Sequence, residues 1–315
     1  MIKNKRISVV IPVHNVGKSI LEFLNKIPDY VDLIFLIDDK CPLKTGETAK
    51  ENFPNLEKLK IIMNEKNLGV GGAVKIGYQE SLNNNIDIIV KIDGDDQMNP
   101  NEIEKLVFPL LENYDYCKGN RFIDKNEIEN YPKARFYGNI FLSFMTKLST
   151  GYWDIFDPIN GFTAIKRECL MNLDLNNIDN GYYFESDMLH NLYLKKNKVK
   201  DVAVEIKYFK NQIQNMNVIK EAFNFFFKNT LRFLKRIKLI YLNNNFTLGS
   251  FFLTVFLISG VFTCLYGGYN YFYFGNKNIF APTGVVLISS ISLLLMFISL
   301  MIFLIIDNFN NPNNK

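Results

Sequence analysis

The sequence predicts an α/β domain built on a largely parallel sheet, followed by a helical part that associates with a membrane. From residue 5 to about residue 210, short β-rich runs alternate with segments whose apolar residues recur at helical spacing, which is the pattern of an α/β sheet domain. Nearer the C-terminus, two runs without a charged residue each reach the roughly 20 residues that a helix needs to cross a bilayer. The same region is basic, because eight Lys or Arg and two acidic residues follow residue 214.

Composition argues against several classes of protein function. The chain has 315 residues, of which 48% are hydrophobic and 22% charged, and this mixture is too apolar for a disordered protein. The net charge of +4 is small, and the basic excess lies in the most apolar region, which favours a membrane surface over a nucleic acid as partner. The four cysteines form no CxxC pair, so neither a zinc site nor a disulfide framework is predicted. With two histidines, a hydrolase built on a catalytic histidine is disfavoured.

The elements of the first part follow one another from strand to helix. Strands are predicted for residues 7–11, 33–37, 59–63, 86–92 and 116–118. Helices are predicted for residues 18–26, 47–52, 72–82, 102–111, 137–149 and 184–194. A last strand, residues 199–208, closes a domain that we expect to span residues 1–214.

The second part is expected to begin with a basic amphipathic helix, residues 215–247. Its apolar residues recur at helical spacing and Lys or Arg fill the other face, which predicts a helix lying on an anionic leaflet. A soluble helix packed on the domain is the alternative. Residues 248–306 then predict a hairpin of two transmembrane helices, 248–266 and 284–306, joined by an aromatic-rich loop, 267–282. The basic cluster before the first span predicts that this end, and with it the tail 307–315, is cytoplasmic.

The strongest local motif is IIVKIDGDDQMNP, residues 88–100, where an apolar strand runs into clustered carboxylates. Asp93 and Asp95 are two residues apart, so on an extended backbone their side chains point to the same side. Carboxylates at the carboxyl edge of a parallel sheet are well placed to hold a divalent metal beside a diphosphate, and Gln97 adds a neutral oxygen ligand. The alternative is a solvated acidic turn that caps the next helix, and Asp96 needs no other explanation.

Two further strand ends are expected to deliver polar groups to the same edge. VVIPVHN contains Pro12, which we expect to stop the first strand, and Asn15 in the exit turn. LIDDKCP contains Asp38 and Asp39 at the end of the second strand. Three such ends predict a nucleotide crevice. The glycine-rich NLGVGGAVKIG, residues 67–77, matches neither a P-loop nor a dinucleotide motif, and its backbone either approaches a ligand or forms a tight turn with close helix packing.

In order and spacing, these motifs resemble the inverting family 2 glycosyltransferases with a GT-A fold, and among them the polyprenyl-phosphate (dolichyl-phosphate) glycosyltransferases. VVIPVHN is similar to the first-strand motif of that family, LIDDKCP to its nucleoside-binding segment, and NLGVGGAVKIGY to its glycine-rich stretch. DGDDQ resembles its DxD-type metal motif, and GNRF, KARFYGN and DPINGFTAI resemble acceptor-side segments. The resemblance implies a GT-A (Rossmann-like) nucleotide-sugar-binding domain, followed by an amphipathic interfacial helix and two transmembrane helices.

The resemblance also implies roles for individual residues. The residues expected to bind the nucleotide sugar are Pro12, Asn15, Asp38, Asp39, Gly69 and Asp93. Asp39 would contact the nucleobase. The cofactor would be Mg²⁺ or Mn²⁺, held on the sugar-nucleotide diphosphate by Asp93, Asp95 and Gln97. The residues expected at the lipid phosphate are Arg121 and Arg135, together with Lys207 or Lys210.

The chemistry of inversion adds a catalytic set. Inversion needs a nucleophile opposite the leaving diphosphate and positive charge to offset the charge that develops there. A sugar hydroxyl acceptor needs a general base, whereas a lipid phosphate is already an anion. Arg121 and Arg135 suit the task of holding two anions side by side, with surface salt bridges as the alternative. In FESDML, Glu185 and Asp187 either orient the acceptor or the sugar hydroxyls, or cap a helix; with Asp95 they complete the expected set.

We therefore expect an enzyme that moves a hexose-type sugar from a nucleotide sugar to undecaprenyl or dolichyl phosphate at the cytoplasmic membrane face. The protein is expected to be integral to the membrane, for which we expect the bacterial inner membrane, and to have no nucleic-acid partner; a homo-oligomer is left open. Two alternatives stay open. One is a family 2 transferase acting on another membrane lipid or glycan acceptor, and the other is a non-catalytic membrane scaffold with this fold.

Overall fold

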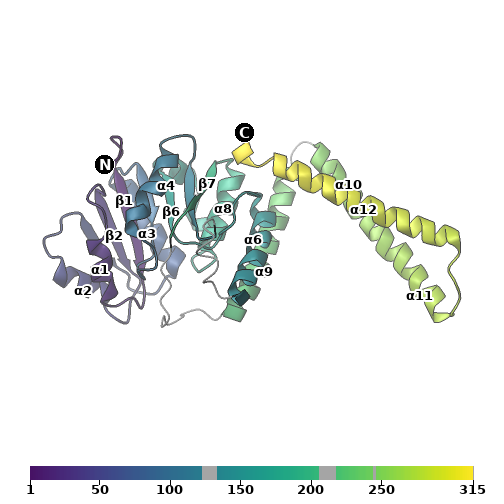
Figure 1. The fold of residues 1–315 in the computed structure, drawn as a ribbon, viewed down its shortest axis with the longest axis horizontal. Helices are drawn as coiled ribbons and strands as arrows, with labels where there is room; N and C mark the ends of the chain where they lie inside the picture. The colour runs from purple at the N-terminus through teal and green to yellow at the C-terminus, as the bar shows by residue number, and fades with distance from the viewer. Residues whose placement is uncertain (123–132, 206–217, 244–245, 315) are drawn as a thin grey trace. The chain divides into compact units, whose positions relative to one another are not determined.

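The computed structural model describes residues 1–122, 133–205, 218–243 and 246–314 (Figure 1). These residues divide into two compact units, Met1–Phe233 and Leu234–Asn314. The first unit is an α/β domain and the second consists of long apolar helices. The fold class predicted from the sequence, an α/β domain followed by two long apolar helices, is confirmed.

Seven strands of the described residues form the sheet of the first unit, in the order β3-β2-β1-β4-β6-β5-β7. The strands are β1 (Ile7–Val13), β2 (Leu33–Asp38), β3 (Leu59–Met63), β4 (Ile88–Lys91), β5 (Tyr116–Asn120), β6 (Thr163–Lys166) and β7 (Val199–Ala203). Strands β1 to β4 pair in parallel, whereas β6 runs antiparallel to both β4 and β5. The sheet is therefore mixed, and β6 is a strand that the sequence did not predict.

Helices connect the strands and cover the sheet. They are α1 (Ser19–Asn25), α2 (Thr45–Asn52), α3 (Val70–Asn83), α4 (Ile103–Leu110), α6 (Lys133–Thr150), α7 (Arg167–Met171), α8 (Phe184–Leu194) and α9 (Val218–Ile237). Each predicted helix of the domain is present, with ends shifted by a few residues, and α8 has the predicted bounds. The short helix α7 was not predicted.

The two faces of the central strand β1 support different helices. All seven residues of β1 are buried, and each buried Val or Ile side chain contributes roughly 1.5–3 kcal/mol. Val9 and Ile11 belong to the apolar cluster that includes α1 and α4. Val10 points to the opposite face because side chains alternate along a strand. There α3 approaches so closely that a Cβ on Gly77 would lie 2.2 Å from Val10 Cγ1, which explains the glycine.

Strand β1 continues through Pro12, which we had expected to stop it. Pro12 is in register with Ile37 of β2, while the pairing of β1 with β4 has already ended at Val10. The missing N–H of Pro12 would point to the β4 side, as that of Val10 does, and there it has no ladder bond to make. The strand therefore tolerates the proline.

Helix α9 has its basic residues on a different side from the one the sequence predicted. Phe225, Asn229 and Arg236 are buried, whereas Phe223 and Phe227 are exposed, with 74% and 63% of their surface accessible. The amphipathic pattern was expected to turn Lys and Arg toward an anionic leaflet. Several of these cations instead face carboxylates inside their own unit, because a buried carboxylate needs a partner.

The second unit contains two helices long and apolar enough to cross a membrane, Leu248–Asn276 with 29 residues and Thr283–Phe309 with 27. The first comprises α10 (Leu248–Phe262), a π-helical turn (Thr263–Gly267) and α11 (Gly268–Asn276), and the second is α12 (Thr283–Phe309). At 1.5 Å per residue, α12 is about 40 Å long, enough for a hydrocarbon core of about 30 Å.

The prediction of an aromatic-rich loop over residues 267–282 is wrong for most of these residues. The helix continues through the π-helical turn to Asn276, so that residues 277–282 form the connection. The pair Gly267-Gly268 suggested a break, but both glycines have helical dihedral angles. In an apolar environment the backbone N–H and C=O groups must be paired within the segment, which favours continuing the helix.

A buried ion pair lies near the end of α12. Arg236 Nη1 is 2.6 Å from Asp307 Oδ1, Arg236 Nη2 is 3.0 Å from Asp307 Oδ2, and the hydroxyl of Tyr241 donates to Asp307 Oδ1 at 2.7 Å. All three side chains are buried. Such a pairing makes a charge tolerable beside a long apolar helix.

Candidate active site

Three charged side chains meet at the carboxyl end of β4. Lys91 is buried, and its Nζ lies 2.7 Å from Asp93 Oδ1 and 2.7 Å from Oε1 of Glu185 on α8. Burial lowers the pKa of Lys91, but the carboxylates of Asp93 and Glu185 outweigh it and hold the pKa above its usual value. Lys91 is therefore charged and ties the sheet to α8. The sequence predicted Asp93 and Glu185 as site residues but did not predict that Lys91 joins them.

Asp95 follows in the same loop. Its pKa is raised to about 6, first because the carboxyl is buried and second because of the charge of Asp93. The backbone N–H of Gln97 donates to Asp95 Oδ1 at 3.3 Å. Two neighbouring carboxylates, Asp93 and Asp95, form a donor set that a divalent cation stabilises.

The predicted metal ligands are Asp93, Asp95 and Gln97. Across the described ranges, no group of three or more Asp, Glu, His or Cys side chains is arranged to hold a metal ion. Mg²⁺ is usually bound by one or two carboxylates, with substrate phosphates and water as further ligands. Asp93 and Asp95 supply that number, so the residues present fit a divalent ion that binds together with a diphosphate. Gln97 as a ligand stays a prediction.

Asp96, the third carboxylate of DGDDQ, is paired elsewhere. Both of its oxygens accept from Lys26 Nζ, at 2.9 and 2.8 Å. Its φ of +59° lies in the left-handed region, which Asp and Asn tolerate better than most residues. Asp96 thus stabilises the turn through Lys26, whereas the helix that follows is capped by Asn99, whose side chain accepts from the N–H of Asn101.

Asp38 and Asp39, at the end of β2, both bind backbone N–H groups. Asp38 accepts from the N–H of Cys41 and of Gly46, each at 2.6 Å, and so fixes the start of α2. Asp39 accepts from Leu68 N at 2.9 Å and Gly69 N at 2.8 Å. Both aspartates are buried. Asp39 therefore holds the glycine-rich segment in place, and its contact with a nucleobase stays a prediction.

The glycine-rich segment, residues 67–72, is packed against the chain that precedes α8. A Cβ on Gly69 would lie 2.5 Å from the carbonyl oxygen of Asn180, and one on Gly71 would lie 2.5 Å from that of Asp179. Gly69 also has a φ of +82°. Of the two interpretations of these glycines, close packing is therefore observed. In the neighbouring turn, Asn15 has a φ of +60° and donates its backbone N–H to Cys41 Sγ at 3.1 Å.

Arg121, predicted to bind the lipid phosphate, forms a bidentate ion pair with buried Asp157. Its Nε lies 2.7 Å from Asp157 Oδ2 and its Nη2 lies 2.8 Å from Oδ1, an arrangement that fixes the plane of the guanidinium. Arg135 lies in α6, but its side chain is outside the described residues, as are Lys207 and Lys210.

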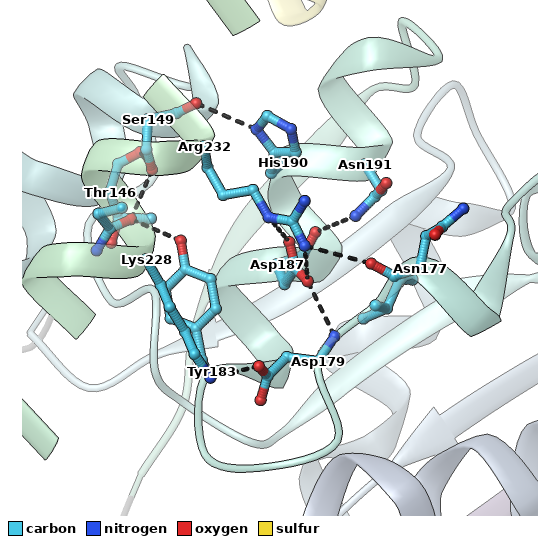
Figure 2. A network of polar contacts seen from close by, with 12 residues as sticks. Thr146, Ser149, Asn177, Asp179, Tyr183, Asp187, His190, Asn191, Lys228 and Arg232 are labelled. Carbon is cyan, nitrogen blue, oxygen red and sulfur yellow. Dashed lines mark hydrogen bonds and ion pairs between the residues drawn. The ribbon is translucent and has the colours of Figure 1, made fainter. Parts of the chain in front are cut away.

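Glu185 and Asp187 lie on different faces of α8. Two residues apart on a helix are separated by about 200°, so Glu185 meets Lys91 at the sheet while Asp187 meets Arg232 of α9. Arg232 Nε is 2.7 Å from Asp187 Oδ1 (Figure 2). The structure thus separates the two carboxylates that the sequence placed together.

A second buried lysine accompanies Lys91. Lys118 of β5 donates to the carbonyl oxygen of Asn160, and burial lowers its pKa to about 8. Neither lysine was predicted from the sequence as a site residue. The available signal was a charged residue at a buried position of a predicted strand, in IIVKI and in YCKGN, because a lysine is seldom fully buried without a partner.

Gly161 closes this cluster, and we expect Gly161→Ala to disturb it. The added Cβ would lie 2.1 Å from Asp93 Oδ2 and 2.3 Å from Lys91 Nζ. Because neighbouring atoms must move to make room for this Cβ, the substitution should lower the free energy of unfolding by about 1–3 kcal/mol. It should also reduce transferase activity. Thermal denaturation measures the first effect and a transfer assay the second. Gly138→Ala is the control, because no described atom lies within 4 Å of its Cβ. Full activity of Gly161→Ala would contradict the expectation.

Comparison with known proteins gives the following similarities. The model of "Glycosyl transferase family 2" matches residues 8–174. The chain is 30% identical to the UDP-N-acetylglucosamine–dolichyl-phosphate N-acetylglucosaminyltransferase of Methanococcus voltae, over 65% of this chain and 86% of that protein. It is 29% identical to the dolichol-phosphate mannosyltransferase of Pyrococcus furiosus, over 55% of this chain and 49% of that protein.

The fold has similar solved structures. One is glucosyl-3-phosphoglycerate synthase from Mycobacterium tuberculosis in complex with Mn²⁺, UDP and phosphoglyceric acid, with a TM-score of 0.56 and 20% identity, over 74% of this chain and 78% of that one. At this identity the likeness concerns the fold alone.

Proposed function

Since the chain belongs to glycosyl transferase family 2, it is a glycosyltransferase, and we propose that it transfers a hexose-type sugar, with inversion, from a nucleotide sugar to a polyprenyl phosphate. The names of several relatives support this acceptor. They include the two archaeal enzymes above, the polyprenol monophosphomannose synthase of Mycolicibacterium smegmatis and the undecaprenyl-phosphate mannosyltransferase of Micrococcus luteus, each 25% identical.

The observation that carries the proposal is the pairing of Glu185 and Asp187, the two acidic residues of FESDML that were predicted as site residues. Glu185 is in an ion pair with buried Lys91, and Asp187 is in one with Arg232. A hydroxyl acceptor needs a base to take its proton, whereas a phosphate acceptor attacks as an anion. Carboxylates held by internal cations suit an acceptor of the second kind.

The residues at the ends of β2 and β4 would bind the donor. Mg²⁺ or Mn²⁺ held by Asp93 and Asp95 would bind the donor diphosphate and offset the charge that develops on it during transfer. Asp39 keeps the glycine-rich segment at the edge of the sheet. Arg121, oriented by Asp157, would hold the lipid phosphate opposite the leaving group.

The second unit would anchor the enzyme where its acceptor lies. Its two long helices expose apolar side chains along their length, as transmembrane helices do. Helix α9 adds an exposed apolar face that suits the membrane interface, formed by Phe223, Phe226, Phe227 and Leu231. The basic excess before the first span supports a catalytic domain on the cytoplasmic side.

The test is transfer of radiolabel from a panel of UDP- and GDP-sugars into organic-extractable lipid by membranes that contain the protein, with Mg²⁺, Mn²⁺ or a chelator. We expect one donor to yield an acid-labile labelled lipid, and chelation to remove it. Label in another lipid or in a glycan would show that the acceptor is not a polyprenyl phosphate. No labelled product from any donor, with folded protein and polyprenyl phosphate present, would overturn it.

A further inference from the structure

Helix α9 turns polar side chains inward on the side opposite its exposed phenylalanines. Asn229 is fully buried, and its Oδ1 accepts from Ser149 Oγ of α6 at 2.6 Å and from the hydroxyl of Tyr183 at 3.0 Å. The ring of Phe225, one turn earlier, stacks edge-on against Tyr183 with 5.3 Å between the centroids. These contacts fix the rotation of α9 about its axis, so that its next polar residues also point to the domain (Figure 2).

Those polar residues bind the segment that leads into α8, residues 177–183. Lys228 donates to Asp179. Arg232 lies 2.7 Å from each oxygen of Asp187 and donates to the carbonyl of Asn177 at 3.2 Å. Asp187 in turn accepts from the backbone N–H of Asp179 at 2.9 Å. Two cations of α9 thus hold the first part of the segment, at Asn177 and Asp179, and tie it to Asp187 of α8 (Figure 2).

The other side of segment 177–183 lies against the glycine-rich segment, residues 67–72. The N–H of Gly72 donates to the carbonyl of Asn180 at 3.1 Å. Lys75, in the first turns of α3, donates to Asn180 Oδ1 at 2.7 Å. The absence of side chains on Gly69 and Gly71 allows the two backbones to touch. Movement of segment 177–183 therefore cannot leave the glycine-rich segment unchanged.

The glycine-rich segment is also held from the sheet. Asp39, at the end of β2, binds the N–H groups of Leu68 and Gly69. The segment is thus bound on one side by Asp39, in the proposed donor site, and on the other by residues 177–183, which α9 clamps. Both sets of contacts lie within the first unit.

We propose that Arg232 and Lys228 are positioning residues for the donor site: by clamping segment 177–183 they hold the glycine-rich segment against Asp39, so that donor affinity depends on how α9 is seated. Neither cation pairs with a residue that is expected to bind the donor. The role in donor binding rests on the proposed function, whereas the mechanical link rests on the contacts alone.

Hydrogen exchange of the full-length protein in detergent tests the link without reference to activity. In Arg232→Gln, we expect the amides of Leu68, Gly69 and Gly72 to exchange about tenfold faster than in the wild type, the size of a typical coupling between sites. Lys228→Gln should act in the same direction. Protected amides of β1 report that the domain is folded. Unchanged exchange of all three amides in both folded variants would overturn the proposal.

Donor binding tests the consequence. The dissociation constant of the nucleotide sugar used by the wild type should rise about tenfold in Arg232→Gln, with kcat much less affected, and Arg232→Lys should recover part of the affinity. Lys235→Gln, which removes a charge from an exposed position of the same helix, should change neither exchange nor affinity. Equal donor affinity in wild type and Arg232→Gln would overturn this inference but would leave the proposed function intact. A wild type that binds no nucleotide sugar would overturn the proposed function, while faster exchange in the variants would still establish the link.

Discussion

Asp95→Asn is expected to lower the transfer of sugar to lipid by about a thousandfold, since a bound metal contributes several kcal/mol of charge stabilisation in the transition state. Asp95 is one of two carboxylates that fit a divalent ion, and burial and the charge of Asp93 raise its pKa although Lys91 acts in the opposite direction. Asparagine has nearly the same shape but removes the negative charge. Initial rates at saturating donor over a series of Mg²⁺ and Mn²⁺ concentrations measure the loss.

The adjacent carboxylate offers a matched control. Asp96→Asn makes the same chemical change one residue away, at a side chain paired with Lys26, and asparagine tolerates the left-handed backbone there. Loss of this partly buried ion pair costs about 1 kcal/mol of stability, because Lys26 keeps about a third of its side chain in contact with water, so activity should stay within about threefold of the wild type. A large loss in Asp96→Asn with little loss in Asp95→Asn would contradict the assignment of the metal ligands.

Lys91→Met is expected to be strongly destabilising. It removes the ammonium group from between Asp93 and Glu185, and Glu185 is left buried without its cation. Breaking a buried pair by removing one partner costs about 3–5 kcal/mol. Thermal or denaturant unfolding in detergent measures the loss, and we expect activity to fall with it because Asp93 is no longer held.

A double substitution separates charge from packing. In Lys91→Met with Glu185→Gln, the unpaired buried charge is gone, so part of the lost stability should return while activity stays low. Lys60→Met is the control, because Lys60 is an exposed lysine on β3, the strand at the far edge of the same sheet. If Lys91→Met were as stable as the wild type, or if Glu185→Gln destabilised the double variant further, the ion-pair account of this cluster would be wrong.

The parts of the fold that the sequence predicted well are those whose signal is local. Strand β1 is a run of buried β-branched residues, and α8 ends where its apolar spacing ends. Strand β6 was missed because it has four residues, Thr163–Lys166, inside a segment that was noted for its resemblance to an acceptor motif. Its identity as a strand comes from pairing with β4 and β5, which are distant in sequence, and no local pattern encodes such partners.

In the site, the acidic residues were predictable and their partners were not. Clustered carboxylates after a strand are visible in any reading of DGDDQ. The cations that bind them come from elsewhere: Lys91 reaches Glu185 across 94 residues, and Arg232 reaches Asp187 across 45. Asp187 is an example: its spacing from Glu185 suggested a shared role, but the two side chains lie on different faces of α8 and have different partners. Ion pairs of this kind are fixed by tertiary packing.

The buried pair between Arg236 and Asp307 has a consequence for how the chain is made. The two residues are separated by 71 positions, with the whole apolar hairpin between them. During synthesis Arg236 leaves the ribosome first and has no carboxylate partner until α12 is complete. A chain that stops short of Asp307 therefore lacks the carboxylate that pairs with this guanidinium. The last turn of α12 thus completes a contact whose other partner lies before α10 begins.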